Sequence, residues 1–287
     1  MKRIVLFRYH HQFKRNLELL RFFKSLNPGV EIYGLYGGPE SAYSEASESL
    51  KEVFSGNYLI EDKPTEWKWK NSDMAFQLWY REYGQNLDFD MLHTLEWDLL
   101  YFEPLERLFG HVPPNALALT GLIPIRKIEK KWYWTRNETR KAEREELLKH
   151  FRDNYGYKQE PFAMIGPGAS FPKNFLEKIK DVEIPDLSND EVRIPMLAQV
   201  FNFPMADSGF FRKWFSNREF KFFNSNAFEV DWKTMEKQLK KPKGRRAFHP
   251  YGKELTLNQL QSLQQMIPGK RKERKPGFFK LGFLSSK

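Results

Sequence analysis

The chain has 287 residues, a formal net charge of +10 and no cysteine. Hydrophobic residues make up 40% of the sequence, enough to build a core, and this excludes a disordered chain. The absence of cysteine excludes disulfides, thiolate zinc sites, iron–sulfur clusters and cysteine nucleophiles, and it favours a reducing compartment.

No apolar run reaches the ~18–20 residues of a membrane span, and the N-terminal run is too short for a signal peptide. We therefore expect a cytoplasmic protein. Two basic runs, 237–246 and 270–280, hold the charge excess, and the rest of the chain is close to neutral. Phenylalanines beside the second run favour contact with an anionic membrane surface, at its inner face, over a plain solvated tail.

The first third of the chain predicts alternating strands and helices. Residues 3–9 and 30–36 are short apolar runs typical of buried strands, and the helical spacing of 12–26 lies between them. A helix near 40–54 and a strand near 58–61 repeat the step, and a helix over 72–83 follows. Strand–helix–strand units this short indicate parallel strand pairs in a doubly wound α/β sheet.

The remaining chain predicts further strands over 90–102, 116–125 and 161–171, the last passing into a Gly-rich loop. Helices are expected over 137–152, 172–180 and 190–201, the last interrupted by Pro195. Residues 221–228 and 245–249 suggest strands, and 256–266 a helix. The final residues are expected to form a loosely held tail.

Two carboxylates, Glu96 and Asp98, stand in the middle of the apolar run 90–102. Side chains alternate along a strand, so both would point to one face. Buried carboxylates are costly unless a cation meets them, and a divalent ion on a diphosphate is one solution. The alternative is a strand end whose acids face water.

Two later features could join that site. His249 precedes a proline, which restricts it to an extended backbone, and imidazole is a common metal ligand; an ordinary surface or core histidine is the alternative. Gly168 lies in a glycine-containing turn before a predicted helix, where a ligand could approach the backbone closely. The turn is neither a Walker loop nor a Rossmann fingerprint.

An acidic pair, Asp190 and Glu191, opens the helix predicted from about residue 190. Acids in a first helical turn are ordinary capping chemistry, but a carboxylate held there could also take a proton from a hydroxyl. Asp207 is a second candidate for that role. His10 and His11 follow the first strand, where α/β sheets bind ligands, and are expected at the rim of a pocket.

Together, the order of these features resembles the GT-A fold of nucleotide-sugar glycosyltransferases, over roughly residues 3–265. The resemblance implies an α/β, Rossmann-type single domain with a mostly parallel central sheet flanked by helices. It implies a domain over 1–267, with a nucleotide-binding part at 1–110 and an acceptor-binding part at 111–267. Residues 268–287 would then be a basic tail.

In that family the acid-x-acid motif holds Mn²⁺ or Mg²⁺ against the donor diphosphate. The resemblance implies Asp98 as the direct ligand, with Glu96, where Asp is commoner, and His249 beside it. It implies Glu191 as the base of an inverting reaction, with Asp190 and Asp207 as alternatives; without a correctly placed base the reaction would retain configuration. Residues implied around the nucleotide or the acceptor side are Phe7, Tyr9, His10, Asp62, Glu96 and Gly168.

The sequence thus predicts a metal-dependent glycosyltransferase of hexosyltransferase type. It would move a sugar from a nucleoside-diphosphate sugar to a hydroxyl of a glycan or lipid-linked acceptor. A nucleotidyltransferase acting on a sugar phosphate ranks second, because no Gly-rich loop follows the first strand. A non-catalytic basic protein that binds a membrane surface or nucleic acid is the third interpretation. No nucleic-acid partner is expected, since the basic residues gather near the C-terminus.

Overall fold

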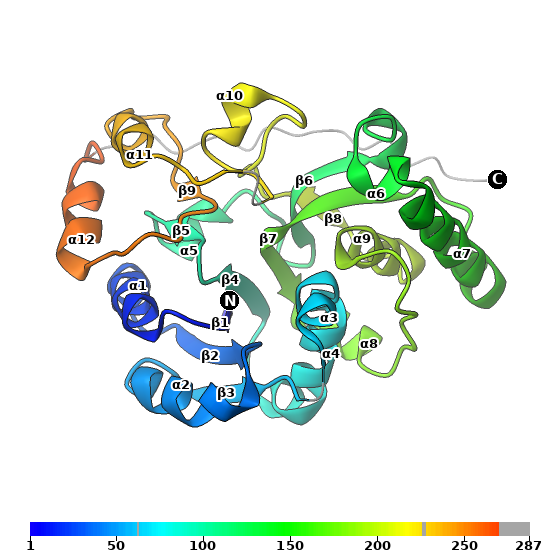
Figure 1. Ribbon diagram of the computed structural model, residues 1–287, viewed down its shortest axis with the longest axis horizontal. Helices are drawn as coiled ribbons and strands as arrows, with labels where there is room; N and C mark the ends of the chain where they lie inside the picture. Colours follow the sequence, from blue (N-terminus) through cyan, green and yellow to red (C-terminus); the bar gives the residue numbers. More distant parts are fainter. Residues whose placement is uncertain (62, 226–227, 270–287) are drawn as a thin grey trace.

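A seven-stranded mixed sheet forms the centre of the protein, and helices cover both of its faces (Figure 1). The computed structural model describes residues 1–61, 63–225 and 228–269. The strand order is β3-β2-β1-β4-β7-β6-β8, and β5 and β9 form a separate two-stranded sheet. The strands are β1 (Arg3–Tyr9), β2 (Glu31–Tyr36), β3 (Gly56–Leu59), β4 (Met91–Glu96), β5 (Leu100–Tyr101), β6 (Leu117–Pro124), β7 (Phe162–Pro172), β8 (Met205–Asp207) and β9 (Ala247–Phe248).

The main sheet is mostly parallel. β1 pairs in parallel with β2 and β4, β2 with β3, and β6 with β8. Only β7 is reversed, and it runs antiparallel to both β4 and β6. The predicted α/β class with a mostly parallel, helix-flanked sheet is confirmed. β2 and β3 lie on one side of β1 and β4 lies on the other, so the strand order reverses between β1 and β4. α/β proteins commonly bind ligands at the carboxyl ends of the strands at such a topological switch point.

The helices connect and cover these strands. The α-helices are α1 (Phe13–Leu26), α2 (Tyr43–Leu50), α3 (Thr65–Lys70), α4 (Ser72–Glu82), α5 (Leu105–Leu108), α6 (Tyr133–Arg136), α7 (Glu138–Tyr155), α8 (Lys173–Ile179), α9 (Asp190–Val200), α10 (Asn217–Phe220), α11 (Trp232–Leu239) and α12 (Leu257–Gln265). Short 3-10 turns occur at Glu40–Ala42, Gly84–Asn86 and Ile125–Lys127.

The core consists of two apolar layers, one on each face of the sheet. α1, α2, α11 and α12 contribute to one layer, and α4, α7, α8 and α9 to the other. β1 serves both, since Val5 and Phe7 pack in the first layer while Ile4 and Leu6 pack in the second. A strand buried on both faces reads as a continuous apolar run, which is why the sequence pattern located it correctly.

Two predicted segments differ from the structure near the expected site. The run 90–102 is not one strand, because β4 ends at Glu96 and the chain turns at residues 97–98. β5 then pairs with β9 in the second sheet. Glu96 and Asp98 therefore do not project from one strand face, as the alternation had predicted: Glu96 ends the strand and Asp98 lies in the turn.

The predicted Gly-rich loop at 166–171 is also wrong. Gly166 and Gly168 lie within β7, which continues to Pro172 and joins α8 directly. Gly168 has φ +78°, and a Cβ atom there would come within 3.0 Å of the Tyr101 hydroxyl and of Phe210. The glycine thus permits an irregular strand in close packing, where the pairing register with β6 also shifts.

Smaller differences lie downstream. α9 continues through Pro195. The strand expected over 221–228 is absent from its described residues, where Phe223 forms only an isolated bridge with His249. The short helix α3 and the helix α11 were not predicted.

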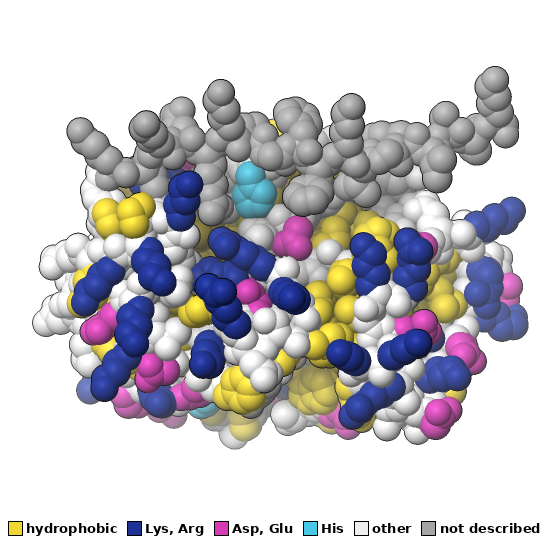
Figure 2. All heavy atoms as spheres, turned by 90° about the horizontal axis from the view of Figure 1, so that it is seen from above, with side chains coloured by type: hydrophobic (Ala, Val, Ile, Leu, Met, Phe, Trp, Pro, Cys, Tyr) yellow, Lys and Arg dark blue, Asp and Glu magenta, His cyan; other side chains and the backbone are white. Residues whose placement is uncertain are grey.

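Basic side chains are not confined to the predicted runs. Figure 2 shows Lys and Arg side chains spread over the face seen from above. The run 270–280, and with it most of the predicted tail 268–287, lies outside the described residues. Within the described residues, no helix combines the length and the apolar character that crossing a membrane requires.

Candidate functional site

The first polar pair of the site joins adjacent parallel strands. Arg8 and Glu96 are directly opposite in the β1–β4 register, and Arg8 Nη1 lies 3.3 Å from Glu96 Oε1. Arg8 Nη2 also donates to the Lys68 carbonyl at 3.1 Å. Burial raises the pKa of Glu96, and the Arg8 guanidinium offsets part of this. A buried carboxylate requires a nearby positive charge. For Glu96, Arg8 on the neighbouring strand β1 supplies it.

Asp98 and His249 form a second buried pair. His249 Nε2 lies 3.2 Å from Asp98 Oδ1, and His249 Nδ1 lies 2.6 Å from the Asn224 carbonyl. Burial by itself would raise the pKa of Asp98 and lower that of His249, but their mutual attraction outweighs it. The pKa of Asp98 is therefore lowered and that of His249 raised, as in a charged pair.

These two side chains fit a divalent cation. Asp98 Oδ1 and His249 Nε2 converge on one point. The Asn224 carbonyl accepts from the Nδ1–H of His249, so in neutral histidine Nε2 carries no proton and is the atom that could bind a metal ion. Mg²⁺ and Mn²⁺ commonly use few protein ligands and complete their shell with water and phosphate oxygens. In the part of the chain that the structure describes, no three acidic or histidine side chains group around one point. Glu96 faces Arg8 here, and its role as a metal ligand stays a prediction.

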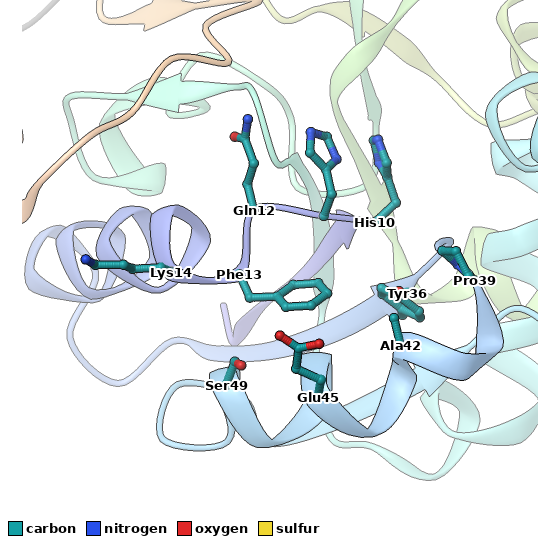
Figure 3. A pocket seen from close by; sticks show the side chains of 10 residues that line it. His10, Gln12, Phe13, Lys14, Tyr36, Pro39, Ala42, Glu45 and Ser49 are labelled. Carbon is teal, nitrogen blue, oxygen red and sulfur yellow. The ribbon is translucent and has the colours of Figure 1, made fainter.

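A cavity of about 520 Å³ opens at the carboxyl ends of β1 and β2 (Figure 3). The aromatic rings of Phe13 and Tyr36 face it, with centroids 6.2 Å apart. The other lining residues are His10, His11, Gln12, Lys14, Pro39, Ala42, Glu45 and Ser49. An aromatic cavity with a few polar groups is the usual form of a small-molecule site.

Three buried polar atoms in the cavity wall have no hydrogen-bond partner in the protein: His11 Nδ1, Gln12 Oε1 and the Tyr36 hydroxyl oxygen. Buried polar groups are nearly always satisfied, so such atoms point to a ligand. Gln12 also has a left-handed backbone, with φ 56°, which is strained for a residue with a side chain. Unsatisfied atoms and backbone strain therefore gather in one place.

The predicted nucleotide residues fall into three groups. His10 lines the cavity, and its pKa is lowered to about 4 by burial and by the neighbouring His11. Tyr9 is buried and its hydroxyl accepts from Asn57 Nδ2 at 2.8 Å, while Phe7 is fully buried in the core. Asp62 lies outside the described residues.

Sequence reasoning missed three important residues of this region. Phe13 and Tyr36 form the aromatic walls of the cavity, and Arg8 pairs with Glu96. Arg8 carried a usable signal, because it is a charge at the carboxyl end of an apolar run. Tyr36 also ends a predicted strand at the sheet edge where ligands are expected.

The cavity is joined to the Asp98 turn by direct contacts. The rings of His10 and His11 lie 5.5 Å and 4.3 Å from that of Trp97. The buried guanidinium of Arg15, at the start of α1, donates to the carbonyls of Trp97, Tyr251 and Lys253. Arg15 thereby fixes the two segments that carry Asp98 and His249.

Glu191, the predicted base, faces the middle of β7. Its Oε1 accepts from the Gly166 amide at 3.0 Å, and its Oε2 accepts from Asn189 Nδ2 at 3.2 Å. Burial, and next the charge of Asp190, raise the pKa of Glu191 to about 8. Pro195 lies four residues after Glu191 in α9 and has no N–H, so the Glu191 carbonyl does not receive the usual helical hydrogen bond.

Asp190 has a different environment. It is buried and accepts from the Ser72 hydroxyl, and burial together with Asp73 raises its pKa to about 6. Asp207 lies on the outer strand β8, and its carboxylate accepts from the Gly209 amide at 2.6 Å. The structure thus places Asp190 and Glu191 beside β7, whereas Asp207 belongs to another strand. The catalytic roles of all three stay predictions.

No family model matches the sequence, and no curated protein matches it. Among solved structures, the galactosyltransferase LgtC in complex with donor and acceptor sugar analogs has 11% identity and a TM-score of 0.38, with 94% of this chain and 98% of that chain covered. An active-site mutant of LgtC has 14% identity and a TM-score of 0.34, with 71% and 73% covered. The apo glycosyltransferase GlyE of Streptococcus pneumoniae TIGR4 has 16% identity and a TM-score of 0.34, with 72% and 45% covered. Likeness at this level assigns no substrate, metal or mechanism to the chain.

Proposed function

We propose that the protein is a glycosyltransferase that uses a nucleoside-diphosphate sugar and a divalent cation. The observation that carries this proposal is an aromatic cavity whose His11 ring lies 4.3 Å from Trp97, the residue before Asp98 of the buried Asp98–His249 pair. A nucleoside needs an aromatic cavity with free polar groups, and a diphosphate needs concentrated positive charge beside it. The cavity would meet the first requirement, and a divalent cation held by Asp98 and His249 would meet the second.

The nucleoside would occupy the cavity, with its base against Phe13 or Tyr36 and its polar atoms meeting His11, Gln12 and the Tyr36 hydroxyl. The pKa of His10 is lowered to about 4, so its side chain is neutral at pH 7. In the cavity it would act as a hydrogen-bonding group and not as a cation. The diphosphate would then extend toward the turn at Asp98.

Asp98 and His249 would hold Mn²⁺ or Mg²⁺, which supplies positive charge at the diphosphate oxygens when bound. Arg8, held by Glu96 and the Lys68 carbonyl, is a fixed cation close to the same edge. During transfer the bond between the sugar C1 and the phosphate oxygen breaks, and its electron pair stays on the departing diphosphate. A prearranged positive environment stabilises that charge.

Glu191 is the proposed base. A new bond forms between the acceptor oxygen and C1, and the acceptor proton passes to the Glu191 carboxylate. Glu191 suits this role better than Asp190, because Asp190 is buried whereas Glu191 is only partly buried. Attack opposite the leaving diphosphate would invert the configuration at C1.

The test is thermal melting with UDP, GDP, CDP and dTDP, each with and without Mn²⁺. A ligand at a hundred times its Kd stabilises a protein by about 2.7 kcal/mol, which raises Tm by several degrees. We expect one diphosphate to shift Tm in the presence of metal and to lose this effect in Asp98→Asn. The matched control Asp88→Asn changes a fully solvated carboxylate and should keep the shift. Cooperative melting with no shift for any diphosphate would refute the proposal and favour a non-catalytic binding protein.

A second experiment separates transfer from nucleotidyl chemistry. Nucleotide sugars that shift Tm are incubated with a pool of glycans and lipid-linked acceptors, and the products are identified by mass. Release of a nucleoside diphosphate with gain of a sugar on the acceptor supports the proposal. Release of pyrophosphate from a nucleoside triphosphate and a sugar phosphate would instead identify a nucleotidyltransferase.

A further inference from the structure

Two exposed aromatic side chains gather where α3 and α6 meet. The exposed fractions of Trp69 and Tyr133 are 53% and 51%, among the highest of the large hydrophobic side chains described. Both contact the buried Trp134, with ring centroids 6.3 Å from Trp69 and 5.6 Å from Tyr133. We call Trp69, Tyr133 and Trp134 the aromatic platform. An exposed tryptophan beside an exposed tyrosine is a typical feature of binding surfaces.

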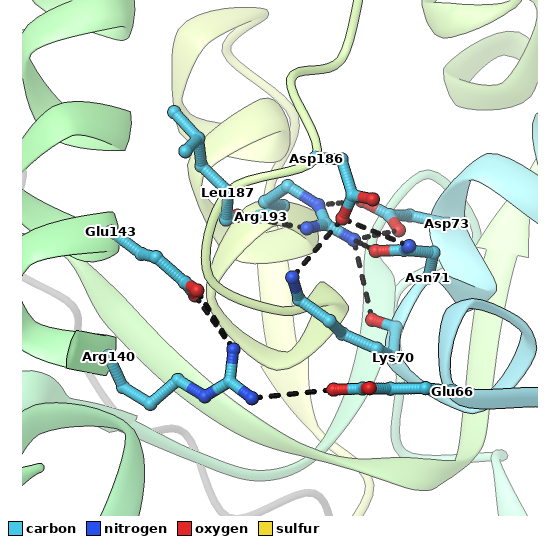
Figure 4. Close-up of polar contacts among 9 residues, drawn as sticks. All are labelled: Glu66, Lys70, Asn71, Asp73, Arg140, Glu143, Asp186, Leu187 and Arg193. Atoms are coloured by element: carbon cyan, nitrogen blue, oxygen red, sulfur yellow. Dashed lines mark hydrogen bonds and ion pairs between the residues drawn. The ribbon is translucent and has the colours of Figure 1, made fainter.

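The platform is held in place by polar contacts on α7. The Arg140 guanidinium lies over the Trp134 ring, 5.1 Å from its centroid, and bonds to Glu143 on the same helix. Its other nitrogen reaches Glu66 on α3 at 3.4 Å (Figure 4). Arg140 thus connects α3 to the α6–α7 segment, so the rings from the two segments are kept together.

The platform is linked to the proposed catalytic site through α3. Trp69 follows Lys68, whose carbonyl accepts from Arg8, and Arg8 pairs with Glu96. On the other side of α3, Asn71 bonds to the buried Arg193 of α9, the helix that begins with Asp190 and Glu191 (Figure 4). One short helix therefore carries an exposed ring and also contacts the groups that flank the proposed base.

The surface chemistry selects the occupant. A pyranose ring has an apolar C–H face and an equatorial rim of hydroxyls. The flat indole of Trp69 matches the face, and the ion-paired side chains of Arg140, Glu66 and Glu143 beside Trp134 provide donors and acceptors for the hydroxyls. A lipid chain would leave this charged rim unused.

We propose that the aromatic platform binds a pyranose ring of the acceptor, which makes the acceptor a carbohydrate rather than a simple alcohol. This inference rests on the proposed glycosyltransferase function. The acceptor hydroxyl would project from the platform toward Glu191, and the cavity at Phe13 and Tyr36 would keep the nucleotide.

The test measures binding of lactose, maltose, cellobiose and N,N′-diacetylchitobiose to the full chain by isothermal titration, with the diphosphate and metal that shift Tm present. At least one disaccharide should bind, and Trp69→Ala and Tyr133→Ala should each weaken it by about tenfold or more. Trp69→Phe, which keeps a flat ring, should restore most of the affinity. Tyr83→Ala and Phe228→Ala remove equally exposed rings elsewhere and should bind as the wild type does.

Several results would overturn the inference. One is that no disaccharide binds; another is that the platform variants bind as well as the controls. A third is that the wild type sediments as a dimer and Trp69→Ala as a monomer, which would make the platform a self-association surface. If a diphosphate shifts Tm in any of these cases, the proposed function stands and only the acceptor site fails. If no diphosphate shifts Tm, the proposed function itself has failed, and sugar binding at Trp69 would not be an acceptor site.

Discussion

At the scale of single residues, Glu191 combines two hydrogen bonds that favour its charged form with burial that opposes it. Burial and the adjacent Asp190 prevail, and the pKa rises to about 8. A base must be deprotonated to act, so we expect kcat/KM for transfer to rise with pH and level off above about 8. Glu191→Gln should lower kcat by roughly 10²–10⁴-fold at pH 8.5. A flat pH profile, or a variant with wild-type kcat, would contradict the assignment of Glu191 as the base.

The raised pKa of Glu191 also predicts that the free energy of unfolding depends on pH. A folded-state pKa above the unfolded value near 4.5 means that the folded chain binds more protons between those two pH values. The stability linked to Glu191 is therefore complete below pH 4.5 and is lost as pH rises through about 8. Glu191→Gln cannot ionise, so its Tm should exceed that of the wild type at pH 8.5, and the difference should shrink toward pH 5. The exposed control Glu183→Gln should show no such trend, and equal trends in both variants would refute the explanation.

At the scale of elements, a buried ion pair joins α4 to α9. Arg193 donates from Nε and Nη2 to the two carboxylate oxygens of Asp73, each at 2.7 Å, and from Nη2 to Asn71 Oδ1 at 2.6 Å (Figure 4). Neither charged side chain of the pair is exposed. This contact fixes the first turn of α9, and with it Asp190 and Glu191, against α4.

Breaking this pair should be costly, because the partner left behind is a buried, unpaired charge. We expect Arg193→Met to lower the free energy of unfolding by about 3–5 kcal/mol in urea titrations. Arg193→Lys should also destabilise, since an ammonium group cannot reproduce the two-nitrogen contact with the carboxylate. Lys51→Met removes an exposed pair with Glu48 and should change stability by less than about 1 kcal/mol. Equal losses in Arg193→Met and Lys51→Met would contradict this account.

Local patterns predicted the elements that obey them. β1, α1 and α4 were located to within a residue or two, because apolar spacing decides which face of each element is buried. β9 falls within the strand predicted over 245–249, and β5 within the run 90–102. The two strands have two residues each and pair only with one another, so no local pattern separated β5 from β4. The end of β4 at Glu96 was missed for the same reason: the following residues leave the sheet to make that distant pairing.

The candidate site could be predicted only in part. Asp98, His249 and Glu191 were identified as chemistry-bearing residues, and the structure places the first two in contact. His10 and His11, expected at the rim of a pocket, line the cavity. Its aromatic walls and the platform on α3 and α6 were not predicted, since each is assembled from separate segments of the chain. The glycines of β7 were misinterpreted as a loop, because close packing against Tyr101 and Phe210 is a tertiary property.

At the scale of the whole molecule, the beginning and the end of the described chain meet at the candidate site. Arg15 of α1 donates to the Lys253 carbonyl at 2.9 Å and to the Trp97 carbonyl at 2.5 Å, and it also donates to the Tyr251 carbonyl. Burial lowers the pKa of Arg15 to about 10, which still leaves it charged at neutral pH. One side chain thus joins the first helix, the Asp98 turn and the segment after His249, and no single part of the chain contains both Asp98 and His249.

This arrangement predicts that Arg15 affects both folding and ligand binding. Arg15→Met leaves one buried and two partly buried carbonyls without their donor, and we expect the free energy of unfolding to fall by about 3 kcal/mol or more. Where the variant remains folded, the turn and the segment after His249 are no longer held together, so the metal-dependent Tm shift by the nucleoside diphosphate should shrink or vanish. Arg21→Met, on the same helix, removes an exposed arginine paired with Glu18 and Glu52 and should preserve both properties. Urea titration and thermal melting with ligand measure the two effects separately. A destabilised Arg15→Met variant with an undiminished Tm shift would show that Arg15 supports the fold without organising the site.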